Sequence, residues 1–168
     1  MTAFESFRLE ELSELPPDLP GIADEQPQAF WALSNGKGWR LGLGQNSDEA
    51  EPAILASPSG VLFVGLYHGT TASVHPDDGR ILDRVKLMGK VVFWTDYGEL
   101  VLATGELEAA VFDSSGRLLC KAGLADVLDS AEISDGILRL HDMSGRSGSF
   151  DARSGRPVKD DSLDKPAD

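Results

Sequence analysis

Three histidines and a single cysteine are the residues of this sequence whose types could do chemistry most readily. His68 precedes a glycine in a turn, His75 ends an apolar run, and His141 stands beside Asp142. A zinc site needs three or four ligands close together, and these spacings do not supply them. Adjacent strand residues point to opposite faces, so Asp142 is badly placed to orient His141 as a base. We expect no metal site and no catalytic residue.

Other signals for catalysis or cofactor binding are weak. Cys120 lies in the apolar run RLLCKAGL, which predicts a buried structural thiol. The G-x-S-x-G elbow is absent, and GLGQNS at 42–47 lacks the third glycine of a dinucleotide-binding loop. The turns HPDDGR, DSSGR and DARSGR offer one or two carboxylates each, too few for a calcium loop. We expect their aspartates to cap the turn backbone, and we expect no cofactor.

The remaining candidates are residues that could bind a protein. The net charge of −13 repels nucleic acids and anionic membranes, and it favours encounter with a basic protein. Aromatic anchors among acids are typical of binding hot spots. The predicted contact set combines an acidic loop at 45–52, two tyrosines in turns and a pair of carboxylates on one strand: Asp48, Glu49, Glu51, Tyr67, Tyr97, Glu106 and Glu108.

Three similar segments contain several of these residues. They are SGVLFVGLYHGTTASVHPDDGRIL from Ser59, YGELVLATGELEAAVFDSSGRLL from Tyr97 and DGILRLHDMSGRSGSFDARSGRPV from Asp135. Each runs from a glycine through an apolar strand, a turn and a second strand to Gly-Arg. The three Gly-Arg pairs, which begin at 79, 116 and 155, are separated by 37 and 39 residues. With one further strand before and one after, each unit predicts four antiparallel strands.

These segments resemble the blades of quinoprotein-like and WD40-like β-propellers, over about two-thirds of the chain. The resemblance implies blade geometry. The tryptophan that such blades often carry after the Gly-Arg pair is replaced by Leu82, Leu119 and Val158, and no cofactor pocket carries over. Together with a weaker copy at 29–56, the segments predict an all-β fold of repeated four-stranded antiparallel units, a small or incomplete propeller. It is either a squat four-unit assembly or an open, curved stack.

The first 28 residues are expected to precede the repeats. Thr2 and Glu5 fit a capping box, and apolar residues follow at helical spacing, so 2–15 predicts one short helix that ends at Pro16. The proline-rich segment 16–28 predicts an irregular linker. We expect a single domain, 1–168, made of the N-terminal helix and linker (1–28), a β-repeat core (29–158) and a disordered acidic tail (159–168).

The function indicated by these features is that of a non-enzymatic, acidic protein-binding module. No run approaches the roughly 20 apolar residues of a membrane span, and the N-terminus is too acidic for a signal peptide, so we expect a cytoplasmic protein. A bacterial immunity or inhibitor protein that occludes a basic toxin or enzyme fits this description, and a homodimer could cover an open sheet edge. The alternative is a small-ligand-binding or hydrolytic propeller-like protein that uses His68, His75 or His141, and a third possibility is a structural subunit of a larger complex.

Overall fold

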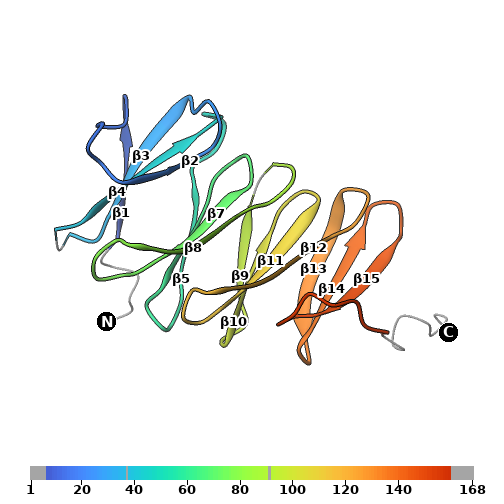
Figure 1. Ribbon diagram of the computed structural model, residues 1–168. Coiled ribbons are helices and arrows are strands. Elements are labelled where there is room, and N and C mark those ends of the chain that lie inside the picture. Colours follow the sequence, from blue (N-terminus) through green and yellow to red (C-terminus); the bar gives the residue numbers. More distant parts are fainter. Residues whose placement is uncertain (1–6, 37, 91, 160–168) are drawn as a thin grey trace.

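The computed structural model describes residues 7–36, 38–90 and 92–159. Within these ranges, fifteen strands form four sheets, which we call A to D in chain order. Figure 1 shows the sheets lying in a row, with sheets A and D at opposite ends. The all-β fold of repeated antiparallel sheets is therefore confirmed, and the units are arranged as an open stack.

Sheets B and C are four-stranded meanders with the strand order of propeller blades. Sheet B contains β5 (Ala53–Ala56), β6 (Leu62–Gly65), β7 (Thr70–Val74) and β8 (Ile81–Lys86). Sheet C contains β9 (Phe93–Asp96), β10 (Leu100–Thr104), β11 (Glu108–Asp113) and β12 (Leu118–Gly123). Both sheets have a register shift just before the turn into the last strand, at Ser73/Val74 and at Val111/Phe112. The sequence repeat is thus also a structural repeat.

Sheet D has three strands: β13 (Leu128–Ser134), β14 (Ile137–Asp142) and β15 (Ser147–Asp151). A fourth strand begins beside β15, where Phe150 bridges to Pro157 and Val158 N–H donates to Ser149 O at 2.9 Å. The inward face of sheet D is apolar, whereas residues such as Glu132 point outward. Sheet D is therefore a shortened copy of the units before it.

Sheet A corrects the prediction for the N-terminal region. It has the order β1-β3-β4-β2, with β1 (Arg8–Leu12), β2 (Gly21–Ala23), β3 (Ala29–Ser34) and β4 (Arg40–Gln45). The predicted helix is wrong over its described residues, because β1 pairs antiparallel with β3. An isolated helix of this length has marginal stability in water. As a strand, β1 hydrogen-bonds to the backbone groups along the edge of β3 and packs Leu9 against the core. Residues 2–6 of that prediction lie outside the described residues.

The segment predicted as an irregular linker also joins sheet A. Its strand β2 runs parallel to β4, and Gly21 approaches so closely that a Cβ there would lie 2.8 Å from Gly42 O. Leu15 and Leu19 lie over the outer face of β4 at Gly42, which shields this end of the row. The predicted disordered tail falls, apart from residue 159, outside the described residues, and the single-domain assignment stays a prediction.

Three apolar layers hold the row together, one between each pair of neighbouring sheets. Strand β6 shows the principle: Leu62 and Val64 face sheet A, while Phe63 faces sheet C. Residues in a strand alternate between faces, so a sheet buried on both sides needs a continuous apolar run. Phe63 contacts Phe112 edge-on, with ring centroids 5.6 Å apart. Among the described residues, no helix is long and apolar enough to cross a membrane.

Candidate functional site

The turns of the stack gather at two ends, and the predicted contact residues divide between them. We call one the Tyr67 end, formed by the turns that follow the even-numbered strands β2 to β14, and the other the Tyr97 end. The Tyr67 end holds Asp48, Glu49, Glu51, Tyr67, Glu106 and Glu108. Tyr97 lies in the β9–β10 turn at the other end. The structure therefore brings six of the seven predicted residues to one end.

The acidic loop after β4 is held by a buried glutamine. Gln45 Nε2 donates to Ser47 O at 3.2 Å and to Ala50 O, while Gln45 Oε1 accepts the Tyr67 N–H at 3.0 Å. Ser47 Oγ accepts the Glu49 N–H at 3.1 Å. Because its backbone is held at several points, the loop presents its exposed carboxylates from a defined position beside the Tyr67 turn.

Tyr67 and Glu49 form a direct contact between the two turns. The phenol donates to Glu49 Oε2 at 2.9 Å, and the ring centroid lies 5.5 Å from that of His68. The hydrogen bond to Glu49 raises the pKa of Tyr67, and partial desolvation and the negative charges of Glu49 and Glu106 act in the same direction. Tyr67 thus lies close enough to Glu49 and Glu106, two of the predicted acids, for their negative charges to act on its phenol.

The carboxylates of Glu106 and Glu108 accept backbone hydrogen bonds from another loop, a structural role that the sequence pattern did not indicate. Glu108 Oε2 accepts the Met88 N–H at 2.7 Å, and Glu106 Oε2 accepts the Lys90 N–H at 2.9 Å. Glu108 also pairs with Lys121 Nζ at 3.0 Å. Glu106 lies in the β10–β11 turn and Glu108 begins β11. Both carboxylates therefore hold the β8–β9 loop in place.

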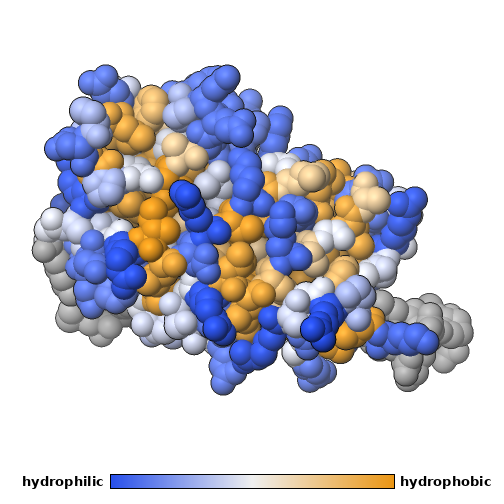
Figure 2. All heavy atoms as spheres, in the orientation of Figure 1, coloured by the Kyte–Doolittle hydropathy of each residue, from blue (hydrophilic) through white to orange (hydrophobic). Residues whose placement is uncertain are grey.

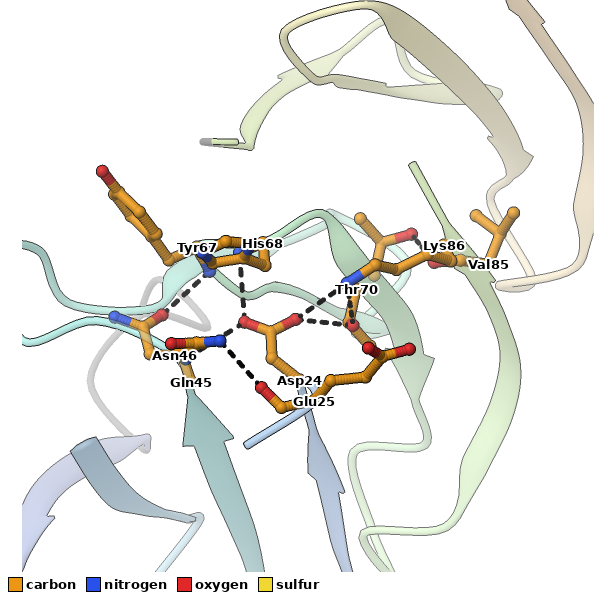
Figure 3. Close-up of polar contacts among 10 residues, drawn as sticks. Asp24, Glu25, Gln45, Asn46, Tyr67, His68, Thr70, Val85 and Lys86 are labelled. Atoms are coloured by element: carbon orange, nitrogen blue, oxygen red, sulfur yellow. Dashed lines mark hydrogen bonds and ion pairs between the residues drawn. The ribbon is translucent and has the colours of Figure 1, made fainter. Parts of the chain in front are cut away.

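A buried carboxylate that sequence reasoning missed joins sheet A to sheet B (Figure 3). Asp24 follows β2, and its side chain is completely buried. It accepts hydrogen bonds from Thr70 Oγ1 at 2.7 Å and His68 N–H at 3.0 Å, and it pairs with Lys86 Nζ at 3.3 Å. The proline-rich surroundings of Asp24 carry no signal for this role, because its partners in sheet B lie more than 40 positions away along the chain.

A pocket of about 710 Å³ opens beside Asp24, where sheets A, B and C meet. His68 lines it, together with three lysines and three glutamates: Lys86, Lys90, Lys121, Glu25, Glu106 and Glu108. The other histidines are not part of it. His75 lies at the Tyr97 end, 3.2 Å from Asp78, and His141 lies on the outer face of sheet D, 2.8 Å from Ser147 Oγ. Within the described ranges, no group of histidine, cysteine and carboxylate ligands is arranged for a metal ion.

Exposed apolar side chains are concentrated at the Tyr67 end. Met88 is 62% exposed in the β8–β9 loop, Phe93 is 66% exposed at the start of β9, and Met143 is 73% exposed in the β14–β15 turn. Tyr97, at the opposite end, is 38% exposed. Figure 2 shows hydrophobic residues in patches between hydrophilic ones over the face in view.

The aspartates of the Asp-Gly turns cap their own backbone, as predicted. Asp113 Oδ1 accepts hydrogen bonds from Ser115 N–H, Ser115 Oγ and Arg117 N–H at 3.0, 2.6 and 3.0 Å. Burial opposes ionisation of Asp113 most strongly, but these hydrogen bonds and Arg117 together lower its pKa. Hydrogen bonds from Ser144 and Ser154 lower the pKa of Asp142 and Asp151. Such turns stabilise the fold and leave little capacity for ligands.

Cys120 is also as predicted. Its thiol is buried in the layer between sheets C and D, and Sγ lies 3.3 Å from Ala152 O. Burial raises the pKa of the thiol, which disfavours the thiolate form.

The strand order and register identify the kind of repeat. It is propeller-like. The predicted resemblance to propeller blades is therefore confirmed for the sheets of this chain.

Solved structures similar to the chain include designed and natural propeller proteins. The designed Ika4 protein is 16% identical over 68% of this chain and 74% of its own, with a TM-score of 0.49. The β-propeller domain of Cps50 (Swd1) from Myceliophteria thermophila is 12% identical over 67% and 38%, with a TM-score of 0.47. BamB from Moraxella catarrhalis is 17% identical over 90% and 51%, also at 0.47. The chain thus spans about half or less of these natural proteins. No protein-family model and no curated sequence matches it.

Proposed function

We propose that this chain is a non-enzymatic protein-binding module whose Tyr67 end binds a basic protein. One observation carries the proposal: Met88, Phe93 and Met143, the three most exposed large apolar side chains among the described residues, lie at the same end as the acidic loop. Apolar anchors of this kind provide most of the binding free energy at protein interfaces. At the opposite end, Tyr97 is the one exposed large apolar side chain within the described ranges.

The charge of the Tyr67 end supports a basic partner. This end carries the exposed acids Glu25, Asp48, Glu49, Glu51 and Asp126, together with the exposed bases Lys86, Lys90, Lys121 and Arg146. The acids in the loop after β4 have no exposed base beside them in the sequence, and the chain as a whole has a net charge of −13. Opposite charge raises the association rate and orients the partner, whereas desolvated apolar contacts slow dissociation. An immunity or inhibitor protein that covers the cationic site of a toxin or enzyme uses this combination, and we propose that role as the specific form of the function.

The position of the anchors is tested by substituting them at constant charge. The double variant Met88→Ser, Phe93→Ser is compared with Tyr97→Ser, which removes an exposed side chain from the other end. Proteins retained from the source lysate by each immobilised variant are quantified by mass spectrometry. We expect the wild type and Tyr97→Ser to retain the same proteins, with isoelectric points above about 9, and the double variant to lose them.

The charge requirement is tested separately with Asp48→Lys, Glu51→Lys. Both side chains are exposed and make no hydrogen bond in the loop framework described above, so the fold should be retained. Capture should weaken in this variant and should fall as salt is raised for the wild type. If both sets of variants retain the same proteins as the wild type, or if the retained proteins are acidic, the proposal is wrong.

A further inference from the structure

The pocket at the Tyr67 end has a floor and walls that are fixed by the fold. Leu87 is completely buried beneath it. The β6–β7 turn meets this floor at Gly69, where φ is +84° and a Cβ would overlap Leu87 O. Gly89, at φ +98°, also packs closely against Glu106, because a Cβ there would lie 2.6 Å from Glu106 Cβ. Such contacts require glycine and leave the backbone little room to collapse into the space.

Hydrogen bonds from backbone N–H groups to buried or partly buried carboxylates hold each wall. Asp24 binds the His68 N–H on the side of sheets A and B. Glu108 and Glu106 bind the Met88 and Lys90 N–H groups of the β8–β9 loop. Ligand sites are largely preformed in this way, and about 710 Å³ falls within the usual range of about 300 to 1,000 Å³ for small-molecule pockets.

The charges around the pocket are balanced in sign but not fully paired. Lys86 pairs with Asp24 at 3.3 Å and Lys121 pairs with Glu108 at 3.0 Å. Among the described residues, Lys90 Nζ and the Glu25 carboxylate make no ion pair. They come from different sheets, Glu25 from the turn after β2 and Lys90 from the loop before β9. Glu106 makes no ion pair either, but its carboxylate accepts the Lys90 N–H. Within the part of the chain that the structure describes, the pocket therefore keeps one lysine and two carboxylates without an ion pair, and Glu25 is the carboxylate that also makes no hydrogen bond.

We propose that this pocket binds a small zwitterion of about dipeptide size, with its carboxylate at Lys90 and its ammonium at Glu25. A purely anionic ligand would meet three glutamates in a chain of net charge −13, and a purely cationic ligand would meet three lysines. A ligand with both charges, separated by a short polar body, would pair with Lys90 and Glu25 at the same time. This proposal does not rest on protein docking, but the pocket shares Met88 with the proposed docking surface, so a docked protein would compete with the ligand.

The test uses the folded chain and four probes. The zwitterions are the dipeptides L-alanyl-L-alanine and L-lysyl-L-glutamate, and succinate and 1,4-diaminobutane are the single-sign comparisons. Calorimetry measures affinity, and amide chemical shifts locate the site. We expect a dipeptide to bind with a dissociation constant in the range of about 0.1 to 5 mM and to shift the amides of His68, Gly89 and Lys90. The single-sign probes should bind at least about fivefold more weakly.

Charge-matched variants separate the site from the general field. Lys90→Met and Glu25→Gln each remove one unpaired charge and leave the wall hydrogen bonds intact, and each should weaken dipeptide binding about threefold to fivefold. Lys159→Met and Glu132→Gln make the same charge changes at exposed positions outside the pocket and should have no effect. The proposal is overturned if neither dipeptide shifts these amides at about 20 mM. Equal binding of succinate or diaminobutane, or equal losses in the control pair, would also overturn it.

Discussion

At the scale of single residues, the Tyr67–Glu49 contact shows how the site sets the chemistry of a side chain. A phenol that donates to a carboxylate loses that hydrogen bond on ionisation and places a second negative charge beside the first. Tyr67 is one of only two tyrosines in the chain, so its ionisation can be followed without interference once Tyr97 is replaced.

We predict that the Tyr97→Phe variant titrates above pH 10, the ordinary pKa of tyrosine being about 10. The direction follows from the Glu49 hydrogen bond, which raises the pKa of Tyr67. Adding Glu49→Gln should lower the midpoint, and adding Glu106→Gln should lower it by less, because Glu106 acts through its charge alone. Tyrosinate absorbance measures the midpoint. The same midpoint with and without Glu49 would show that the contact is not formed in solution.

A second prediction for a single residue concerns the contribution of Asp24 to the stability of the fold. The side chain of Asp24 is completely buried, and removing it leaves the part-buried Thr70 hydroxyl and His68 N–H without their acceptor, so Asp24→Ala should reduce the free energy of unfolding by about 2 to 4 kcal/mol. Lys86→Met removes only a half-exposed partner and should cost less than about 1 kcal/mol. Urea unfolding measures both. Equal losses would mean that the ion pair, and not the buried hydrogen bonds, provides the stability.

At the scale of elements, turns decide how closely neighbouring sheets approach. Gly69 and Gly98 have almost the same backbone conformation, with φ of +84° and +82°. Their surroundings differ, because a Cβ at Gly69 would overlap Leu87 O, whereas a Cβ at Gly98 would meet nothing within 4 Å. Substituting each glycine by alanine therefore separates two costs: both variants have backbone strain, and only the one at Gly69 adds a steric clash.

Gly98→Ala should therefore cost only the left-handed backbone strain, about 1 to 2 kcal/mol. Gly69→Ala should cost about 3 kcal/mol or more, because the strand β7 must also move away from the β8–β9 loop. Thermal and urea unfolding measure the difference. Chemical shifts of Met88 and Lys90 should change in Gly69→Ala and stay constant in Gly98→Ala. Similar costs at the two positions would contradict the close approach of the turn and the loop.

Elements of the repeats were predictable, and those before the repeats were not. Strands β6, β7, β10 and β11 follow from short apolar runs bounded by glycine turns, which are local signals. The helix over 2–15 followed from helical spacing and a capping box, yet residues 8–12 form a strand. Its partner β3 begins at Ala29, so pairing across the chain decided the outcome against the local pattern.

At the scale of the whole molecule, stability depends on layers between sheets. Each inner sheet is apolar on both faces, so it contributes to two layers at once. At the ends of the row the arrangement differs. Leu15 and Leu19 cover sheet A, and the outer face of sheet D carries Glu132 and Arg139. The two end faces of the described row are thus covered or polar, unlike the apolar faces between the sheets.

We predict that Phe63→Ala lowers the free energy of unfolding by about 3 to 5 kcal/mol, because the ring is completely buried between sheets B and C. The matched substitution Phe93→Ala removes a ring that is 66% exposed and should change stability by less than about 0.5 kcal/mol. Calorimetry of both variants provides the measurement. A large loss in Phe93→Ala would show that Phe93 belongs to the core and would remove it from the proposed docking surface.

The sequence by itself determined the kind of unit in this protein: β-strand repeats closed by aspartate-capped turns, with Cys120 buried among them. These features depend on residues a few positions apart, where strand alternation and turn geometry act directly. Only the tertiary structure decided which turns share an end, that Asp24 joins sheet A to sheet B, and that lysines and glutamates from three sheets surround one pocket. Those juxtapositions depend on how sheets stack through buried apolar faces, and stacking joins residues whose separation along the chain carries no local signal.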